Sequence, residues 1–268
     1  MIYSPAQRCL DILEVLADAP DGLALSAVGS TLALPKSATH RFLAVLEGRG
    51  FVRQDPSTRH YRLTFKLPQL AFRFIAASGI TDVAQPILES LASRTGELAG
   101  MAIVDAQTLS WVAKVQGAQR GLRYDDEVGR EVILHATATG KAWLAALPEA
   151  QAMAIVECAA QFGCERCGPR ALTSPAALRR ELRATRKRGW GEAVEEGEPG
   201  VAAVAATVRA SARPDAPVVA TLSVAGPLAR MDSARRHAHA SEALGAAREL
   251  TALWPTRAHW AGGAWRHR

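Results

Sequence analysis

The stretch from Leu34 to Leu63 (LPKSATHRFLAVLEGRGFVRQDPSTRHYRL) constrains the fold of this chain more than any other. Its first half has the spacing of an amphipathic helix, because Leu43 and Leu46 fall on one face and polar or basic residues on the other. Two short β-type runs follow, at 51–54 and 60–63, and the Asp-Pro-Ser-Thr between them favours a turn. A helix followed directly by a basic two-stranded wing predicts a winged helix-turn-helix that binds DNA.

The residues before this stretch complete such a module. Ser4-Pro5-Ala6-Gln7 is a typical helix start, with serine as the cap, proline in the first turn and glutamine as the capping-box partner. This helix is expected to end at Pro20-Asp21-Gly22, and a short second helix is expected over 25–32. We therefore assign residues 1–64 to a winged helix-turn-helix DNA-binding domain.

Residues near the start of a recognition helix reach base edges, and basic residues around them hold phosphates. The residues expected to read bases are Ser37, Thr39 and Arg41. Those expected on the DNA backbone are Lys36 and His40, with Arg8 of the first helix as a further candidate. On the wing, the residues expected at the minor groove or the phosphates are Arg59, His60 and Arg62.

The distribution of charge supports this interpretation. The chain has a formal net charge of +6, and the window from Lys36 to Arg73 contains eight lysines and arginines against Glu47 and Asp55. The remainder is therefore close to neutral, and a basic stripe confined to one module is typical of phosphate contacts. With 49% apolar and 22% charged residues in 268, the chain is expected to fold, and it is long enough for two domains.

A further helix is expected over residues 65–79. Leu67, Leu70 and Phe74 fall on one face of it, and Ser78-Gly79 ends it. An apolar stripe on a helix between domains more often packs on a neighbouring subunit or domain than faces water. We therefore expect residues 65–79 to be a linker helix.

The remainder of the chain mixes strand and helix patterns. The β-type runs fall at 98–104, 108–115, 201–208 and 218–224. The helical segments fall at 139–146, 149–160, 175–188 and 233–253. This order predicts an α+β domain with an antiparallel sheet over residues 80–255. Residues 256–268 are expected to form a flexible tail.

Two motifs in this domain are candidates for ligand contact. In LHATATGKA, Gly140-Lys141 suggests a phosphate-binding loop, but such loops need glycine and Ser/Thr where this chain has His135 and Ala142. A turn that feeds a helix, whose free N–H groups can bind a small anion, is the better interpretation. In VVATLSVAGP, alternation places Thr221, Ser223 and Ala225 on one face of a strand, where a hydroxyl is usually a satisfied core group.

The sequence does not favour an enzyme. Ser223 lacks a G-x-S-x-G elbow, and the carboxylates of Glu195, Glu196 and Glu198 lack a matching histidine pattern. Gly189-Trp190-Gly191 does not complete a dinucleotide-binding fingerprint. We expect no catalytic residues and no cofactor.

Cysteine usage and hydropathy favour a cytoplasmic protein. No segment resembles a signal peptide or a membrane-spanning helix, so reduced thiols are expected. The cysteines are Cys9, Cys158, Cys164 and Cys167. A single C-x2-C pair without a second pair is a weak metal signal, and no metal site is expected.

Four segments, in this order, resemble the isocitrate lyase regulator (IclR) family of bacterial transcription factors over nearly the whole chain. They are the Leu34–Leu63 stretch, LHATATGKAWLA, RGWGEAVEEGEPGVAAVAATV and ATLSVAGPLARM. The resemblance implies an N-terminal winged helix-turn-helix, a linker helix that mediates dimerisation and a C-terminal GAF-like domain that binds a small effector. It also implies a homodimer or homotetramer on palindromic double-stranded operator DNA.

The resemblance also implies an effector site. Ala138 and Thr139 match the backbone turn that holds an effector carboxylate, and Ser223 matches a serine that contacts it. Residues at apolar wall positions are Tyr124 and Val132. Ala203 and Ala225 stand where the glyoxylate-responsive member of the family has a thiol and a second hydroxyl, and its pocket carboxylate is missing near Ala193.

These departures favour a larger and more apolar ligand than glyoxylate. A buried polar group without a partner costs about 1–3 kcal/mol, so losing polar partners disfavours a very small keto acid. The hypothesis is a larger organic acid, such as an aromatic catabolite, with Tyr124 or Trp111 as a stacking surface. Two alternatives stay open: a DNA-binding oligomer without a ligand, and an enzyme that uses the C-terminal pocket.

Overall fold

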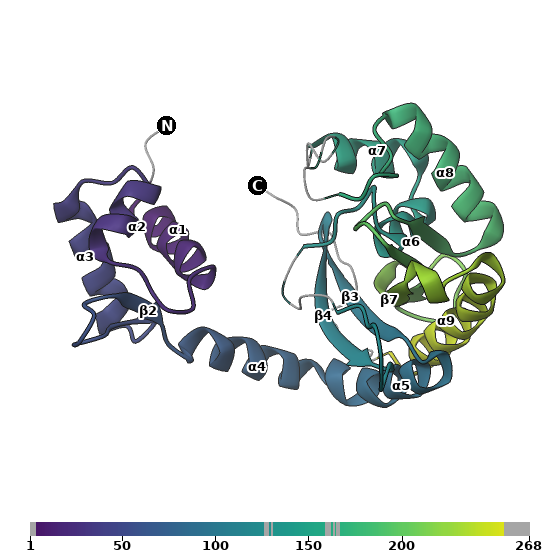
Figure 1. Cartoon of the computed structure of the whole chain (residues 1–268), viewed down its shortest axis with the longest axis horizontal. Coiled ribbons are helices and arrows are strands. Elements are labelled where there is room, and N and C mark those ends of the chain that lie inside the picture. Colours follow the sequence, from purple (N-terminus) through teal and green to yellow (C-terminus); the bar gives the residue numbers. More distant parts are fainter. Residues whose placement is uncertain are drawn as a thin grey trace. The chain divides into compact units, whose positions relative to one another are not determined.

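The structure of the chain is a computed structural model that describes residues 4–125, 129, 131–158, 162, 164 and 167–254. The chain forms two compact units, Met1–Ala77 and Ser78–Arg268 (Figure 1). The predicted tail at 256–268 lies outside the described residues. No helix in the described ranges has both the length and the apolar character of a membrane span.

The N-terminal unit is a winged helix-turn-helix, as predicted. Its elements are α1 (Pro5–Ala17), α2 (Leu25–Thr31), α3 (Lys36–Gly48), β1 (Val52–Gln54) and β2 (Tyr61–Leu63). The predicted capping box is present at the start of α1: the Gln7 N–H donates to Ser4 Oγ at 3.2 Å, and the Ser4 N–H donates to Gln7 Oε1 at 3.4 Å.

A small core holds the wing against the helices. Buried apolar side chains from the three helices and both wing strands form it: Ile12, Leu16, Val28, Leu43, Leu46, Val52 and Tyr61. The backbone of Leu23, just before α2, pairs with Tyr61 of β2. Gly22 makes this close approach possible, because a Cβ there would lie 2.7 Å from the Tyr61 carbonyl oxygen. The wing is therefore fixed relative to α3.

Helix α4 (Lys66–Ser78) follows the wing, and α5 (Ile80–Thr95) begins the second unit. Gly79 separates the two helices with a φ of +70°, in the left-handed region that favours glycine. Helix α5 ends at Gly96, which also has a left-handed backbone.

The second unit is built on a five-stranded sheet with the order β4-β3-β7-β6-β5. The strands are β3 (Leu98–Asp105), β4 (Thr108–Gln116), β5 (Gly191–Val194), β6 (Val201–Arg209) and β7 (Val218–Pro227), and all neighbouring pairs are antiparallel. The predicted antiparallel α+β domain is confirmed. Strand β5 was not predicted, because four residues directly after a helix are too few to show a period of two.

Helices cover both faces of this sheet (Figure 1). Helix α5 and α9 (Ser233–Leu253) pack on one face around buried residues such as Leu88, Leu222 and Leu250. On the other face lie α6 (Ala138–Ala146), α7 (Glu149–Cys158) and α8 (Pro175–Arg188). The helix predicted to reach residue 160 is described only as far as Cys158.

An ion pair joins Glu97, just before β3, to Arg230, just after β7. The Glu97 carboxylate, 3% exposed, receives two hydrogen bonds from the Arg230 guanidinium, at 2.6 and 2.7 Å. A Cβ at Gly226 would lie 2.4 Å from this carboxylate, so glycine leaves room for the pair. Arg230 also donates to the Leu122 carbonyl oxygen at 2.5 Å. Residues 117–125 are thereby held near the sheet.

Candidate functional site

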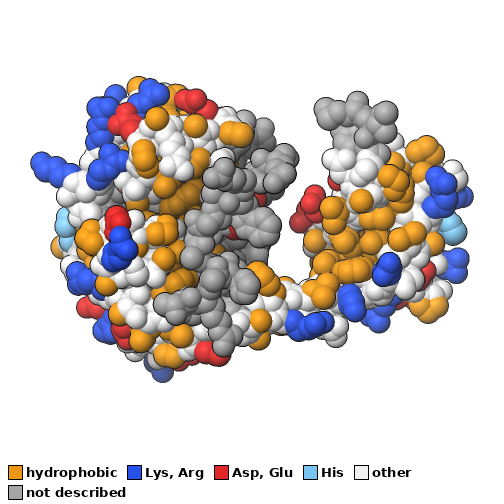
Figure 2. All heavy atoms as spheres, turned by 180° about the vertical axis from the view of Figure 1, so that it is seen from behind, with side chains coloured by type: hydrophobic (Ala, Val, Ile, Leu, Met, Phe, Trp, Pro, Cys, Tyr) orange, Lys and Arg blue, Asp and Glu red, His pale blue; other side chains and the backbone are white. Residues whose placement is uncertain are grey.

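The first turns of α3 present a polar and basic face. The exposed residues there are Lys36, Ser37, His40 and Arg41. They line one shallow depression together with Leu25 of α2. Figure 2 shows lysine, arginine and histidine side chains along the edge of the N-terminal unit where α3 lies. This face has the chemistry that phosphates and base edges require.

Thr39 does not belong to this face, and the prediction that it reads bases is wrong. Its side chain is 0% exposed, and its hydroxyl donates to the Pro35 carbonyl oxygen at 3.1 Å. Thr39 is also close to Gly29 of α2, because a Cβ added at Gly29 would lie 3.1 Å from Thr39 Oγ1. Thr39 therefore packs α3 against α2. Sequence spacing alone did not separate it from its exposed neighbours.

The wing turn is organised by Asp55. Its carboxylate accepts hydrogen bonds from the Ser57 hydroxyl at 2.5 Å and the Ser57 and Thr58 N–H groups at 2.8 and 3.2 Å. These bonds, with the nearby Arg62 guanidinium, lower the pKa of Asp55 to about 2. Arg62 pairs with Asp55 at 3.0 Å, whereas Arg59 is exposed at a left-handed position with a φ of +60°. Arg59 thus lies at the wing tip.

A cavity of about 190 Å³ lies between the sheet and the N-terminus of α6. One row of residues in register across the sheet forms part of its floor: Lys114 on β4, Gly100 on β3 and Ser223 on β7. The adjacent row is apolar and consists of Leu98, Ala225, Ala203 and Ala193. In-register residues point to the same face, so both rows open into the cavity.

Gly100 makes room for the Trp111 ring on the floor of the cavity. A Cβ there would lie 2.9 Å from Cζ3 of Trp111 and 3.1 Å from the Ser223 hydroxyl. The Trp111 ring therefore lies against the backbone of β3, beside the hydroxyl. Within the described part of the chain, the Ser223 hydroxyl donates one long hydrogen bond of 3.5 Å, to the Gly100 carbonyl oxygen. Its hydroxyl can thus bind a second group in the cavity.

The N-terminus of α6 forms the polar wall. Thr137 caps the helix by accepting from the Gly140 N–H at 3.0 Å. The N–H groups of Ala138 and Thr139 have no acceptor within the helix, because the first N–H groups of any helix lack one. Gly191 of β5 lets the helix approach the sheet, since a Cβ there would lie 2.1 Å from the Ala138 carbonyl oxygen. The wall can therefore receive an anion.

Most residues that the family resemblance implied do line this cavity: Tyr124, Ala138, Thr139, Ala203, Ser223 and Ala225, together with Trp111 and Ala193. Val132 does not, and its prediction as a wall residue is wrong. It is 2% exposed, packs in the core on that side of the sheet and donates its N–H to the Leu109 carbonyl oxygen. Its neighbours Glu131 and Ile133 line the cavity instead, because adjacent residues of an extended segment point to opposite sides.

The sequence did not reveal Lys114, Gly100, Thr137 or Glu198 as cavity residues. Lys114 lies within the predicted strand at 108–115, which looks like an ordinary strand. Gly100 lies within the predicted strand at 98–104, where a glycine looks like an irregularity of the strand. Only the pairing of β4, β3 and β7 brings them together. A glycine within a predicted strand was the available signal, since it often marks a close approach to a ligand.

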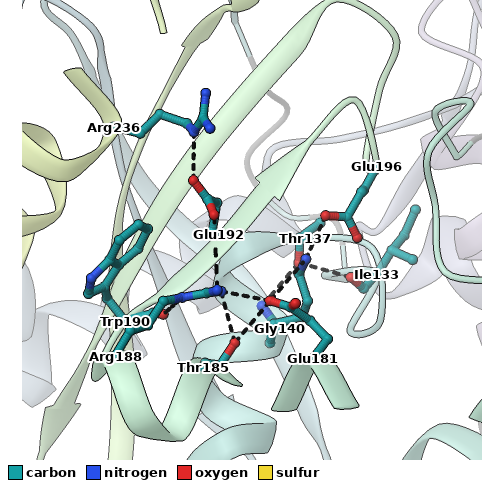
Figure 3. Close-up of polar contacts among 11 residues, drawn as sticks. Ile133, Thr137, Gly140, Glu181, Thr185, Arg188, Trp190, Glu192, Glu196 and Arg236 are labelled. Atoms are coloured by element: carbon teal, nitrogen blue, oxygen red, sulfur yellow. Dashed lines mark hydrogen bonds and ion pairs between the residues drawn. The ribbon is translucent and has the colours of Figure 1, made fainter. Parts of the chain in front are cut away.

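Behind the cavity wall lies an ionic network (Figure 3). The Lys141 ammonium, 1% exposed, lies 2.7 Å from Glu196 Oε1 and 3.9 Å from Glu181 Oε1. The network extends through Arg188, Glu192 and Arg236 to α9. Lys141 is thus engaged within the protein, which supports the interpretation that Gly140-Lys141 is not a phosphate-binding loop.

Among the described residues, no group of three or more His, Cys, Asp or Glu side chains could hold a metal ion. Burial, followed by a hydrogen bond with Cys164, raises the pKa of Cys167 to about 12.

The chain matches two family models in sequence. Residues 5–56 match the IclR helix-turn-helix domain, and residues 72–252 match the C-terminal domain of the bacterial transcriptional regulator IclR. The chain belongs to the IclR family of bacterial transcriptional regulators. Together the two models cover α3, the second half of α4 and the cavity.

Known members of the IclR family match most of the chain. The HTH-type transcriptional regulator XynR of Escherichia coli K12 is 30% identical over 87% of this chain and 90% of its own length. BhcR of Paracoccus denitrificans, also an HTH-type transcriptional regulator, is 32% identical over 91% of this chain and 85% of its own length. These relatives are named as regulators, which agrees with the prediction that this IclR-family protein is not an enzyme.

A solved structure shares the IclR fold. It is an IclR homologue from Microbacterium hydrocarbonoxydans complexed with 4-hydroxybenzoate. The two chains align with a TM-score of 0.75 and 24% identity, over 92% of this chain and 98% of the homologue.

Proposed function

We propose that this IclR-family regulator binds operator DNA through α3 and the wing, and that an aromatic organic acid in the C-terminal cavity changes that binding. The helix-turn-helix makes double-stranded DNA the partner of the N-terminal unit. We propose the class of effector, the residues that contact DNA and the oligomeric state.

The proposed DNA contacts divide by chemistry. Ser37 and Arg41 read base edges, because they are exposed at the start of α3. Residues proposed to hold phosphates or the minor groove are Lys36, His40, Arg59, His60, Arg62 and Arg8. Arg62 and Arg8 already pair with Asp55 and Asp11, so DNA competes with these carboxylates for them.

The protein is proposed to act as a homodimer or homotetramer on a palindromic operator. One winged helix offers too few contacts for high specificity, whereas two copies double them with a fixed spacing. Large apolar side chains around α4 are exposed and would be buried by a second copy: Phe65, Leu70, Phe72 and Phe74. Leu70 and Phe74 lie on one face of α4 and Phe72 lies on the opposite face, and exposed apolar patches of this kind are typical of subunit interfaces.

The observation that carries the effector proposal is the position of Trp111. Its ring lies over Gly100, beside the Ser223 hydroxyl and below the N-terminus of α6. A ligand ring can stack on the indole while its carboxylate binds Ser223 and the N–H groups of Ala138 and Thr139. A cavity of roughly 150 Å³ accommodates benzene, so about 190 Å³ suits one substituted ring.

The 4-hydroxybenzoate complex of the Microbacterium homologue supports this ligand class, since that protein shares the fold. The alanines at 193, 203 and 225 support it too, because they leave an apolar row where a smaller acid would need polar partners.

The proposed mechanism is a population shift. An effector that binds one arrangement of the two units better than another favours that arrangement, and couplings of about 1–3 kcal/mol are usual. Helix α4 joins the units and would transmit the change to the spacing of two recognition helices in an oligomer.

Fluorescence anisotropy can test the proposal. Operator fragments would first be selected from sheared genomic DNA by binding to the full chain. Benzoate and 4-hydroxybenzoate would then be titrated into the complex, with glyoxylate and pyruvate as controls. We expect an aromatic acid to change operator affinity by about 5–150-fold. A response to glyoxylate or pyruvate alone would contradict the aromatic class, and no response to any acid would favour a ligand-independent DNA-binding oligomer.

A further inference from the structure

The cavity has a charged side that the carboxylate site at α6 does not use. Lys114 on β4 lies opposite Gly100 on β3, and Gly100 lies opposite Ser223 on β7. Lys114 and Ser223 therefore face the cavity on either side of a residue without a side chain. Their backbones are two strand spacings apart, which is about 9.5 Å.

Lys114 is already paired, but with a partner that is easily replaced. Its ammonium lies 2.7 Å from Asp125 Oδ1. The Asp125 side chain is 64% exposed, whereas that of Lys114 is 35% exposed. An ion pair that is this accessible to water contributes little to stability. An anion within the cavity can therefore take the place of Asp125.

The other charged groups of the cavity restrict which anions can replace Asp125 at Lys114. Among the described residues that line it, Lys114 is the only lysine or arginine, while Glu131 and Glu198 are acidic and exposed. Acidic side chains repel anions that approach the cavity. For a ligand with a second anionic group, attraction to Lys114 offsets this repulsion, but only if that group reaches Lys114.

We propose that Lys114 is a second anion subsite, and that the effector is an aromatic acid with two acidic groups on opposite sides of its ring. This inference rests on the proposed function, in which one carboxylate binds Ser223 and the N-terminus of α6. The ring then stacks on the Trp111 indole, which lies over Gly100, and the second acidic group displaces Asp125 from Lys114. Lys114 would thus determine which aromatic acids the protein recognises.

Isothermal titration calorimetry on the full chain can test the subsite with two probes, benzoate and benzene-1,4-dicarboxylate. We expect the wild type to bind the dicarboxylate about tenfold more tightly than benzoate. Lys114→Met should remove this preference and leave benzoate affinity within about twofold, while Lys114→Arg should retain it. The matched control is Lys187→Met, on the exposed side of α8, which should change neither affinity.

Asp125→Asn gives an independent test, because it removes a carboxylate that competes for Lys114. It should raise dicarboxylate affinity by about two- to fivefold and leave benzoate unchanged. Equal affinity of the wild type for both acids, or an equal loss of both in Lys114→Met, would overturn the inference while the proposed aromatic effector stands. If neither acid binds the wild type, the proposed effector class itself is wrong. Circular dichroism of each variant would establish that it is folded.

Discussion

The Lys141 ammonium lies 2.7 Å from the Glu196 carboxylate and is 1% exposed, directly behind the wall of the cavity. Gly197 and Glu198, the next residues along the chain, line that cavity, as do Thr137 and Ala138 one turn before Lys141. The ion pair thus joins two segments of the wall. Burial raises the pKa of Glu196 and Lys141 opposes that rise, so desolvation outweighs the attraction within the pair.

Removing one partner of this pair should destabilise the C-terminal unit. Lys141→Met leaves a carboxylate with a raised pKa without its cation, and we expect a loss of about 3–5 kcal/mol. Glu196→Gln should cost less, because Glu181 lies 3.9 Å from Lys141. The double variant should recover most of the loss, since no uncompensated charge remains. Tryptophan fluorescence during urea unfolding measures this unit, because all six tryptophans follow residue 78. A double variant as unstable as Lys141→Met would contradict the expectation.

Gly191→Ala should displace α6 from the sheet. The new methyl group would meet the Ala138 carbonyl oxygen at 2.1 Å, and overpacking of this kind costs about 1–3 kcal/mol. Calorimetry with benzoate should show a weakened or lost effector site. Gly245→Ala is the matched control, because nothing lies within 4 Å of its added Cβ in α9. That substitution should stabilise the protein by up to about 1 kcal/mol. Equal behaviour of the two variants would count against the close packing of α6.

Arg41→Ala and Thr39→Val should separate DNA contact from packing. Arg41 is exposed on α3, so its loss should weaken operator binding about 5–150-fold while benzoate affinity is unchanged. Thr39→Val removes the buried bond to the Pro35 carbonyl oxygen and should cost about 1 kcal/mol of stability. Anisotropy and thermal melting of both variants measure the two effects. If Arg41→Ala lowered operator and effector affinity equally, separate sites would be excluded.

The wing turn should respond to acid through Asp55. Its pKa is lowered to about 2, so the stability that its carboxylate contributes is present above the ordinary value of 3.8 and is lost as pH falls through about 2. Ser57→Ala removes the largest cause, the serine hydroxyl, and should raise this pKa toward 3.8. Carbon-detected NMR titration of the aspartate carboxyls measures the shift. Ser37→Ala should leave the Asp55 titration unchanged, and an unshifted midpoint in Ser57→Ala would refute the role of that hydroxyl.

Much of the fold could be predicted from local patterns. The capping box at Ser4 and Gln7, the spacing of Leu43 and Leu46, and the turn at Asp55 each specify a helix or a hairpin from residues close in sequence. Strand β5 escaped prediction because four residues carry too little periodicity, and pairing with β6 is what makes them a strand.

The sequence by itself determined the winged helix, the antiparallel α+β domain and the helix that begins in LHATATGKA, because caps, turns and hydrophobic periods act over a few residues. Only the tertiary structure decided which side chains are buried in the core and which face the cavity. It buried Thr39 under α2 and turned Val132 into the core, whereas it brought Lys114, Gly100 and Ser223 into one row across three strands. Strand register is set by contacts between distant segments, and a shift of one residue reverses the face that each side chain occupies.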